Sequence, residues 1–334
     1  MKFKIVPAIL IGIILSIVSS KIAYFGFNSS IMANVFTQES FRNGFGNDIY
    51  RYRILSSSLL LALDNTLSTI IDENGEKEPV LKHAKGSTNH FYYAFYYLNT
   101  FFLILVSVII VLLLNLKNAF LVSDGEKYIL LFIAIMSINY TQFIICPYDI
   151  SSYFFQLLTL YIFLRFMNEE FLLTTFAVAS LILISTLNRE SSALSIAITT
   201  ILALQKWGFK RRMFFFSGLS ALAFTIAYVG IRFILKDSGH TKVLNPLAGH
   251  PFLPENIMGV IFWGVFFLLP IMTSNNKKNK WLIGSYHLLS LPYIYMCLKD
   301  GALWEIRLYI PLFLGSLFLA KINTDNTNKF PAFT

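Results

Sequence analysis

The chain has 334 residues, of which 56% are hydrophobic and only 13% are charged, and its formal net charge is +9. A soluble domain carries about 25% charged residues, so this composition excludes a globular protein covered by water and predicts a polytopic membrane protein. Because spans of about 20 residues would use most of this length, we expect one integral membrane domain over residues 1–334 and no separate soluble domain.

The first apolar run, residues 5–18, follows Lys2 and Lys4 and predicts the first span. A signal peptide cleaved near Val18-Ser19-Ser20 is the alternative reading. We favour an uncleaved span, because the later segments are apolar as well and aromatic residues continue beyond that position.

Residues 25–89 form the longest polar stretch, and we expect a long loop on the outer side of the membrane. Within it, residues 54–71 are apolar but are interrupted by three serines, Asp64 and Asn65. This mixture is typical of an amphipathic helix that lies in the interface rather than crossing the bilayer.

Further apolar segments predict an all-α transmembrane bundle over residues 90–321, followed by a short cytoplasmic tail at 322–334. With the first span the total is about ten. The later spans are expected at residues 90–116, 128–145, 153–166, 171–187, 192–204, 213–235, 257–272, 281–298 and 303–320.

Charge patterning predicts the orientation of these spans. With the first residue inside, the inner segments hold 14 of the 27 basic residues but only 5 of the 18 acidic ones. Inner loops of membrane proteins carry an excess of Lys and Arg. The pattern therefore favours an even number of spans with both termini on the cytoplasmic side.

Metal, redox and nucleic-acid functions find no support in the sequence. Cys146 and Cys297 lie in apolar stretches without metal-ligand spacing, which is typical of buried thiols. No glycine-rich phosphate loop occurs, and the basic patches at 210–212 and 277–280 match short inner loops. We therefore predict no cofactor, no metal site and no nucleic-acid partner.

Three short clusters at outward-facing span ends mix carboxylates with guanidinium groups, and ionisable groups beside hydrocarbon are usually functional. The first contains Asp48, Arg51 and Arg53. It is either an interfacial ion pair or a general base with two arginines that bind phosphate, since the guanidinium fork matches phosphate oxygens.

The second cluster, Arg189-Glu190, is either an ion pair that fixes a turn or a functional pair. In the third, Glu305 and Arg307 open the last span, and Arg307 either extends to the headgroups or binds substrate phosphate. Asp149 follows a Cys-Pro-Tyr turn, where we favour a helix cap over a second functional carboxylate.

This layout resembles small bacterial membrane proteins of surface-polysaccharide biosynthesis, and its architecture is similar to that of the GT-C glycosyltransferases. The resemblance implies glycosyl transfer from a polyprenyl-phosphate-linked sugar to a glycan or lipid-linked acceptor, outside the bacterial cytoplasmic membrane, with membrane lipids as further partners. It implies a carboxylate in the first outer loop that acts as base or metal ligand, and only Asp48 matches this carboxylate by position. From the residues themselves, the expected base is Asp48, with Glu190 and Glu305 as weaker candidates, and the expected phosphate ligands are Arg51, Arg53, Arg189 and Arg307.

Two other functions are kept as alternatives. An integral-membrane O-acyltransferase would need a catalytic histidine such as His240 or His250 inside the bundle. A transporter or flippase of a lipid-linked saccharide would place polar residues near the bilayer midplane and show internal repeats. Convergence of the three charged clusters at one outward-facing site would favour an enzyme.

Overall fold

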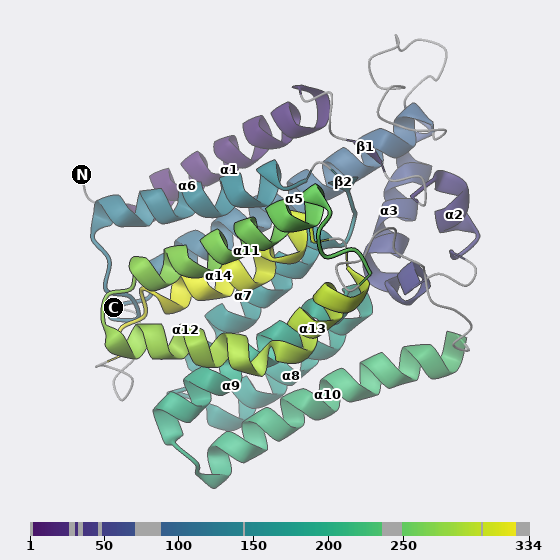
Figure 1. Ribbon diagram of the computed structural model, residues 1–334. Coiled ribbons are helices and arrows are strands. Elements are labelled where there is room, and N and C mark those ends of the chain that lie inside the picture. Colours follow the sequence, from purple (N-terminus) through teal and green to yellow (C-terminus); the bar gives the residue numbers. More distant parts are fainter. Residues whose placement is uncertain are drawn as a thin grey trace.

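The protein is a bundle of helices, described by a computed structural model over residues 3–26, 31–32, 36–45, 49–70, 88–142, 144–235, 249–301 and 303–324 (Figure 1). Asp48 and His240 lie outside these residues. The long helices are α1 (Ile5–Lys21), α5 (Asn89–Leu114), α6 (Asp124–Tyr140), α7 (Asp149–Phe166), α8 (Phe171–Asn188), α9 (Ala193–Trp207), α10 (Arg211–Leu235), α11 (Pro254–Met272) and α12 (Lys277–Leu289).

Shorter elements complete the described part: α2 (Gln38–Arg42), α3 (Ile54–Leu67), α13 (Leu291–Asp300), α14 (Ile310–Leu319), a π-turn after α1 and 3-10 turns η2 (Ile49–Tyr52), η3 (Glu190–Ser192) and η4 (Ile306–Leu308). A two-residue parallel pair, β1 (Ile31–Met32) and β2 (Ile144–Ile145), ties the first loop to the segment before α7. The predicted all-α class is confirmed.

Five described helices are long and apolar enough to cross a membrane, which supports the prediction of a membrane protein. They are α1 with its π-turn, α5, α8, α10 and α11. The predicted total of about ten spans is not established by these helices, and neither is the orientation of the bundle.

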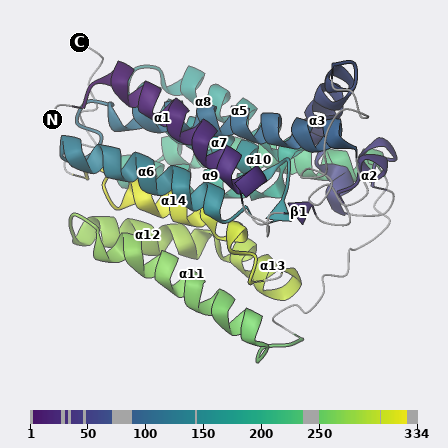
Figure 2. The same ribbon diagram turned by 90° about the horizontal axis from the view of Figure 1, so that it is seen from above.

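The core of the bundle forms around α5, which packs against α1, α3, α6 and α7. Buried residues occur on all sides of this helix, as expected for a helix that is apolar all round. The chain continues from α7 through α8 and α9 to α10, each helix packing on its neighbours, while α11, α12 and α14 pack as a second group (Figure 2).

The two ends of the bundle differ in what they carry. At the end that we call the basic end, on the left of Figure 1, the α5–α6 connection meets the chain after α14: Leu121 N–H donates to the Lys321 carbonyl (2.9 Å) and Asn323 N–H to the Ala119 carbonyl (2.8 Å). The opposite end, on the right of Figure 1, carries α2 and α3, and we call it the cluster end.

The last two predicted spans were wrong as single helices. Residues 281–298 form α12 and α13, which meet at Ser290. Pro292 lies in the first turn of α13, and a proline ring collides with the carbonyl four residues earlier, so α12 cannot continue through it. Within 303–320, Pro311 likewise lies in the first turn of α14, and Glu305 and Arg307 precede the helix instead of opening it.

Candidate functional site

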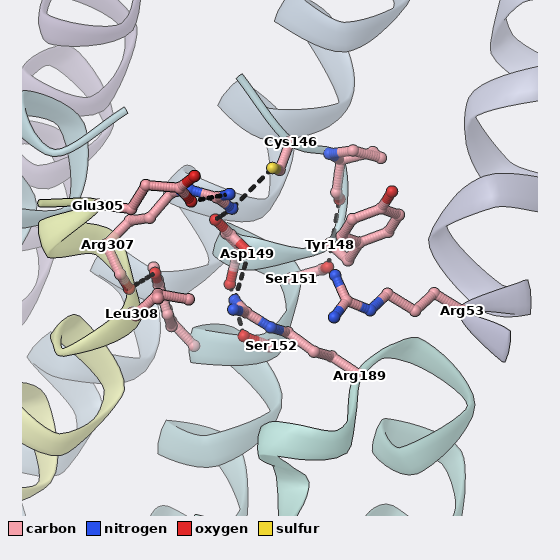
Figure 3. A network of polar contacts seen from close by, with 12 residues as sticks. Arg53, Cys146, Tyr148, Asp149, Ser151, Ser152, Arg189, Glu305, Arg307 and Leu308 are labelled. Carbon is pink, nitrogen blue, oxygen red and sulfur yellow. Dashed lines mark hydrogen bonds and ion pairs between the residues drawn. The ribbon is translucent and has the colours of Figure 1, made fainter. Parts of the chain in front are cut away.

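Asp149, the first residue of α7, is the centre of a buried ionic network (Figure 3). Its side chain is fully buried. Oδ1 accepts a hydrogen bond from an Nη of Arg189, and Oδ2 accepts one from an Nη of Arg307 at 2.7 Å. The carboxylate therefore joins two arginines that are 118 residues apart in the sequence, and the prediction that Asp149 is only a helix cap was wrong.

Arg307 is the most highly connected of these groups. It also donates to Glu305 and to the Cys146 Sγ at 2.7 Å, while its carbonyl accepts from the Tyr153 hydroxyl at 3.0 Å. With its side chain only 6% exposed, Arg307 does not extend toward the headgroups, and that alternative was wrong. We call Asp149, Arg189, Arg307 and Glu305 the inner cluster.

The turn before α7 is held from both sides, which fixes the position of Asp149. Asn99 on α5 donates to the Cys146 carbonyl at 3.0 Å, and Asn188 at the end of α8 donates to the Tyr148 carbonyl at 3.2 Å. The Asn188 amide oxygen accepts a hydrogen bond from Ser56 on α3. These hydrogen bonds join α3, α5 and α8 to the turn that leads into α7 and ends at Asp149.

A second group lies beside the inner cluster and consists of Arg53, Glu190 and Arg232, which we call the outer triad. Glu190 Oε2 lies 3.3 Å from Arg53 Nε, and Glu190 Oε1 lies 3.6 Å from an Nη of Arg232. These residues come from the start of α3, from η3 and from the last turn of α10.

Aromatic rings hold both guanidinium groups of the outer triad. The Arg53 guanidinium carbon lies 4.9 Å from the centre of the Tyr50 ring and 4.8 Å from that of Tyr148, and Figure 3 shows it beside the Tyr148 ring. Arg232 lies 3.6 Å from the Tyr228 ring centre and 4.5 Å from that of Tyr52. Such cation–π contacts fix a guanidinium group without neutralising it.

The charges of the two groups differ. The inner cluster has two arginines and two carboxylates, whereas the outer triad has two arginines and one. Burial raises the pKa of the Glu190 carboxyl, but Arg53 and Arg232 outweigh burial, and the pKa lies below its ordinary value. Removing such ions from water costs several kcal/mol per ion, and only their mutual attraction offsets this cost. Burying these ions therefore opposes folding unless they stay paired.

Most of the predicted site residues are brought together. Arg53, Arg189, Glu190, Glu305 and Arg307 all belong to the two groups, although their segments are far apart in the sequence. Arg51 is half-buried in η2 and belongs to neither group as defined. Asp48 lies outside the described residues, so its role stays a prediction.

Sequence reasoning missed Arg232 and undervalued Asp149. The available signal was an arginine in the last turn of a long apolar helix, and an aspartate directly after a Pro-Tyr turn. Both are ionisable groups at helix ends beside hydrocarbon, where such groups are usually functional.

None of the histidines in the described part of the chain belongs to either group. In the described residues, the His90 Nδ1 lies 2.6 Å from buried Asp64, which also pairs with Arg42, and this contact ties α2 and α3 to α5. His250 precedes α11, and its carbonyl accepts from Asn256 at 2.9 Å. The His287 ring lies 2.8 Å from the Tyr309 hydroxyl.

No group of three or more His, Cys, Asp or Glu that could hold a metal ion occurs in the described part of the chain. Comparison of the chain with protein-family models, with curated proteins and with solved structures gave no match.

Proposed function

We propose that the protein is a membrane glycosyltransferase that takes a sugar from a polyprenyl-phosphate carrier and transfers it to a glycan or lipid-linked acceptor. The observation that carries this proposal is the convergence of Arg53, Arg189-Glu190 and Glu305–Arg307 around Asp149 at one end of the bundle. A transferase needs cations for the leaving phosphate and a carboxylate for the acceptor, and both are present there.

In the proposed reaction, the bond between the sugar and the carrier phosphate breaks while the acceptor oxygen bonds to the same carbon. The acceptor proton passes to a carboxylate, and the carrier leaves as a lipid phosphate whose growing charge the arginines stabilise. Glu305 suits the base role, because it is 18% exposed and Arg307 is its one ion-pair partner in the described residues. Asp48 is the alternative base.

Asp149 takes a positioning role in this proposal. Its carboxylate is fully buried and both of its oxygens are occupied by arginines. It would hold the inner arginines at a fixed separation, as preorganised electrostatic stabilisation requires.

We further propose about ten spans in a bacterial cytoplasmic membrane, with both termini inside and the cluster end facing outward. Basic residues at the basic end support this orientation, because cytoplasmic loops carry excess Lys and Arg. The described residues there include Lys117, Arg165, Lys206, Arg211, Arg212, Lys277 and Lys321.

The test is complementation of a deletion strain with single variants, reading the surface glycan on gels while protein level is controlled. Asp48→Asn, Glu305→Gln and Arg307→Lys should abolish the glycan if they remove the base or the phosphate contacts. Arg165→Ala and Glu169→Gln are matched controls, because this ion pair (2.7 Å) lies at the other end of α7.

A second readout separates transfer from transport. A failed transferase leaves the lipid-linked donor on the outer leaflet, whereas a failed flippase leaves it on the inner leaflet, where added periplasmic enzymes cannot reach it. Retention of the glycan by all the cluster variants would remove the glycosyltransferase proposal and leave the clusters as structural ion pairs.

A further inference from the structure

The outer triad and the inner cluster differ in the exposure of their arginine side chains and in the distances between their paired ions. The side chains of Asp149, Arg189 and Arg307 are 0%, 5% and 6% exposed. Those of Arg53, Glu190 and Arg232 are 11%, 18% and 21% exposed, and their contacts are long, at 3.3 and 3.6 Å. Of the arginines in the two groups, Arg53 and Arg232 are therefore the ones placed to exchange a partner with an incoming group.

The two outer arginines have contacts besides Glu190 that hold them in position. Each guanidinium group packs on two tyrosine rings, Arg53 on Tyr50 and Tyr148 and Arg232 on Tyr52 and Tyr228. Arg232 also donates to the Tyr228 carbonyl at 3.3 Å. If the Glu190 carboxylate moved away, the guanidinium groups of Arg53 and Arg232 would stay in place and both would border the space that it had occupied.

The lipid phosphate that leaves in the proposed reaction is a phosphate monoester, and it fits the space left by Glu190 better than the carboxylate does. Glu190 offers one negative charge through two oxygens to two arginines, which leaves the triad with one uncompensated positive charge. A phosphate monoester carries about −1.5 to −2 charges at pH 7 and three acceptor oxygens. It would neutralise both arginines and accept more than one hydrogen bond from each.

We propose that Arg53 and Arg232 form the binding site for the phosphate of an isoprenoid lipid phosphate, and that Glu190 is the resident anion that this phosphate displaces. Arg189 and Arg307 then stay with Asp149 as positioning residues rather than phosphate ligands. This inference rests on the proposed function and deepens it, because it selects the phosphate ligands and adds Arg232, which the sequence did not single out.

The experiment measures binding without turnover, using purified protein in nanodiscs and three probes: geranylgeranyl monophosphate, geranylgeraniol and inorganic phosphate. We expect the lipid phosphate to bind more tightly than the alcohol. Arg53→Ala and Arg232→Ala should each weaken its binding about tenfold, since each removes charge-assisted hydrogen bonds. Arg→Lys at either position should lose less, because the charge remains.

Glu190→Gln gives the most discriminating result. Removal of the competing carboxylate should strengthen lipid-phosphate binding severalfold while leaving geranylgeraniol binding unchanged. Glu169→Gln and Arg165→Ala, the exposed pair at the basic end, should change neither.

Three outcomes would overturn the proposal: no preference for the phosphate over the alcohol, weaker phosphate binding by Glu190→Gln in a protein that unfolds at the wild-type temperature, or equal binding of inorganic phosphate. The glycan assay is judged separately. If the binding results are as expected but Arg232→Ala cells keep a normal glycan, the phosphate site stands and the glycosyltransferase proposal fails.

Discussion

The ion pairs at the two ends of the bundle differ in how deeply they are buried. At the basic end, ion pairs are partly exposed: the Glu169 side chain, paired with Arg165, is 38% exposed. At the cluster end, Asp149 is fully buried with two arginines. Exposed pairs contribute about 0–1 kcal/mol, whereas buried ions must overcome a large desolvation cost. The two ends therefore differ in the desolvation cost of their ion pairs, which is small at the basic end and large at the cluster end.

The largest expected effect on stability comes from removing the buried carboxylate at the cluster end. Asp149→Ala leaves two buried guanidinium groups without their shared partner, and we expect a loss of about 3–5 kcal/mol in the free energy of unfolding. Glu169→Ala at the basic end should lose less than about 1 kcal/mol. Thermal unfolding of the purified variants in detergent measures both, and equal losses would contradict the contrast.

A second prediction concerns the close packing of α11 against the segment that leads to Glu305 and Arg307. A Cβ added at Gly259 on α11 would lie 2.6 Å from the backbone of Leu303, two residues before Glu305. We expect Gly259→Ala to cost about 1–3 kcal/mol through overpacking and to lower glycan synthesis by shifting the segment with Glu305 and Arg307.

Gly264 on the same helix is the matched control. Among the described residues, a Cβ there meets no atom within 4 Å, so Gly264→Ala should be neutral or slightly stabilising, because alanine favours the helix. If the two variants behave alike, the close approach of α11 to Leu303 does not position the site.

A buried asparagine taken from each end, Asn188 from the cluster end and Asn279 from the basic end, sharpens the comparison. Asn188 donates to the Tyr148 carbonyl at 3.2 Å, and Asn279 donates to the Leu319 and Ile322 carbonyls at 2.6 and 2.9 Å. Either alanine variant should lose about 1–2 kcal/mol, since buried partners are left unsatisfied. Only Asn188→Ala should also reduce glycan synthesis after protein level is matched, and a similar loss with Asn279→Ala would contradict this.

Hydropathy predicted most of the helices because it reads a property that each segment carries by itself. Residues 90–116 were expected to be helical, and α5 spans Asn89–Leu114. The division at Ser290 was missed because the apolar composition continues across it and only Pro292 marks the break. Local composition therefore predicts helices better than it predicts where they end.

The site was predictable only in part, because it depends on contacts between distant segments. Ionisable residues at span ends pointed to Arg53, Arg189, Glu190, Glu305 and Arg307. Which of them pair is a tertiary property: Arg53 pairs with Glu190 at a separation of 137 residues, not with a neighbour. Asp149 looked like a helix cap, since its two arginine partners are invisible in its local sequence.

The smallest expected effect is a coupling energy at each end, measured by double-mutant cycles on unfolding stability. The exposed Arg165–Glu169 pair, spaced i to i+4, should couple by about 0.3–0.5 kcal/mol. Arg53–Glu190 should couple more strongly because water screens it less. The outer triad also lets Arg232 keep Glu190 paired when Arg53 is absent, so the full coupling should emerge only in an Arg232→Ala background. A coupling unchanged by Arg232→Ala would mean that Glu190 serves Arg53 alone, and the two arginines would then not share one anion.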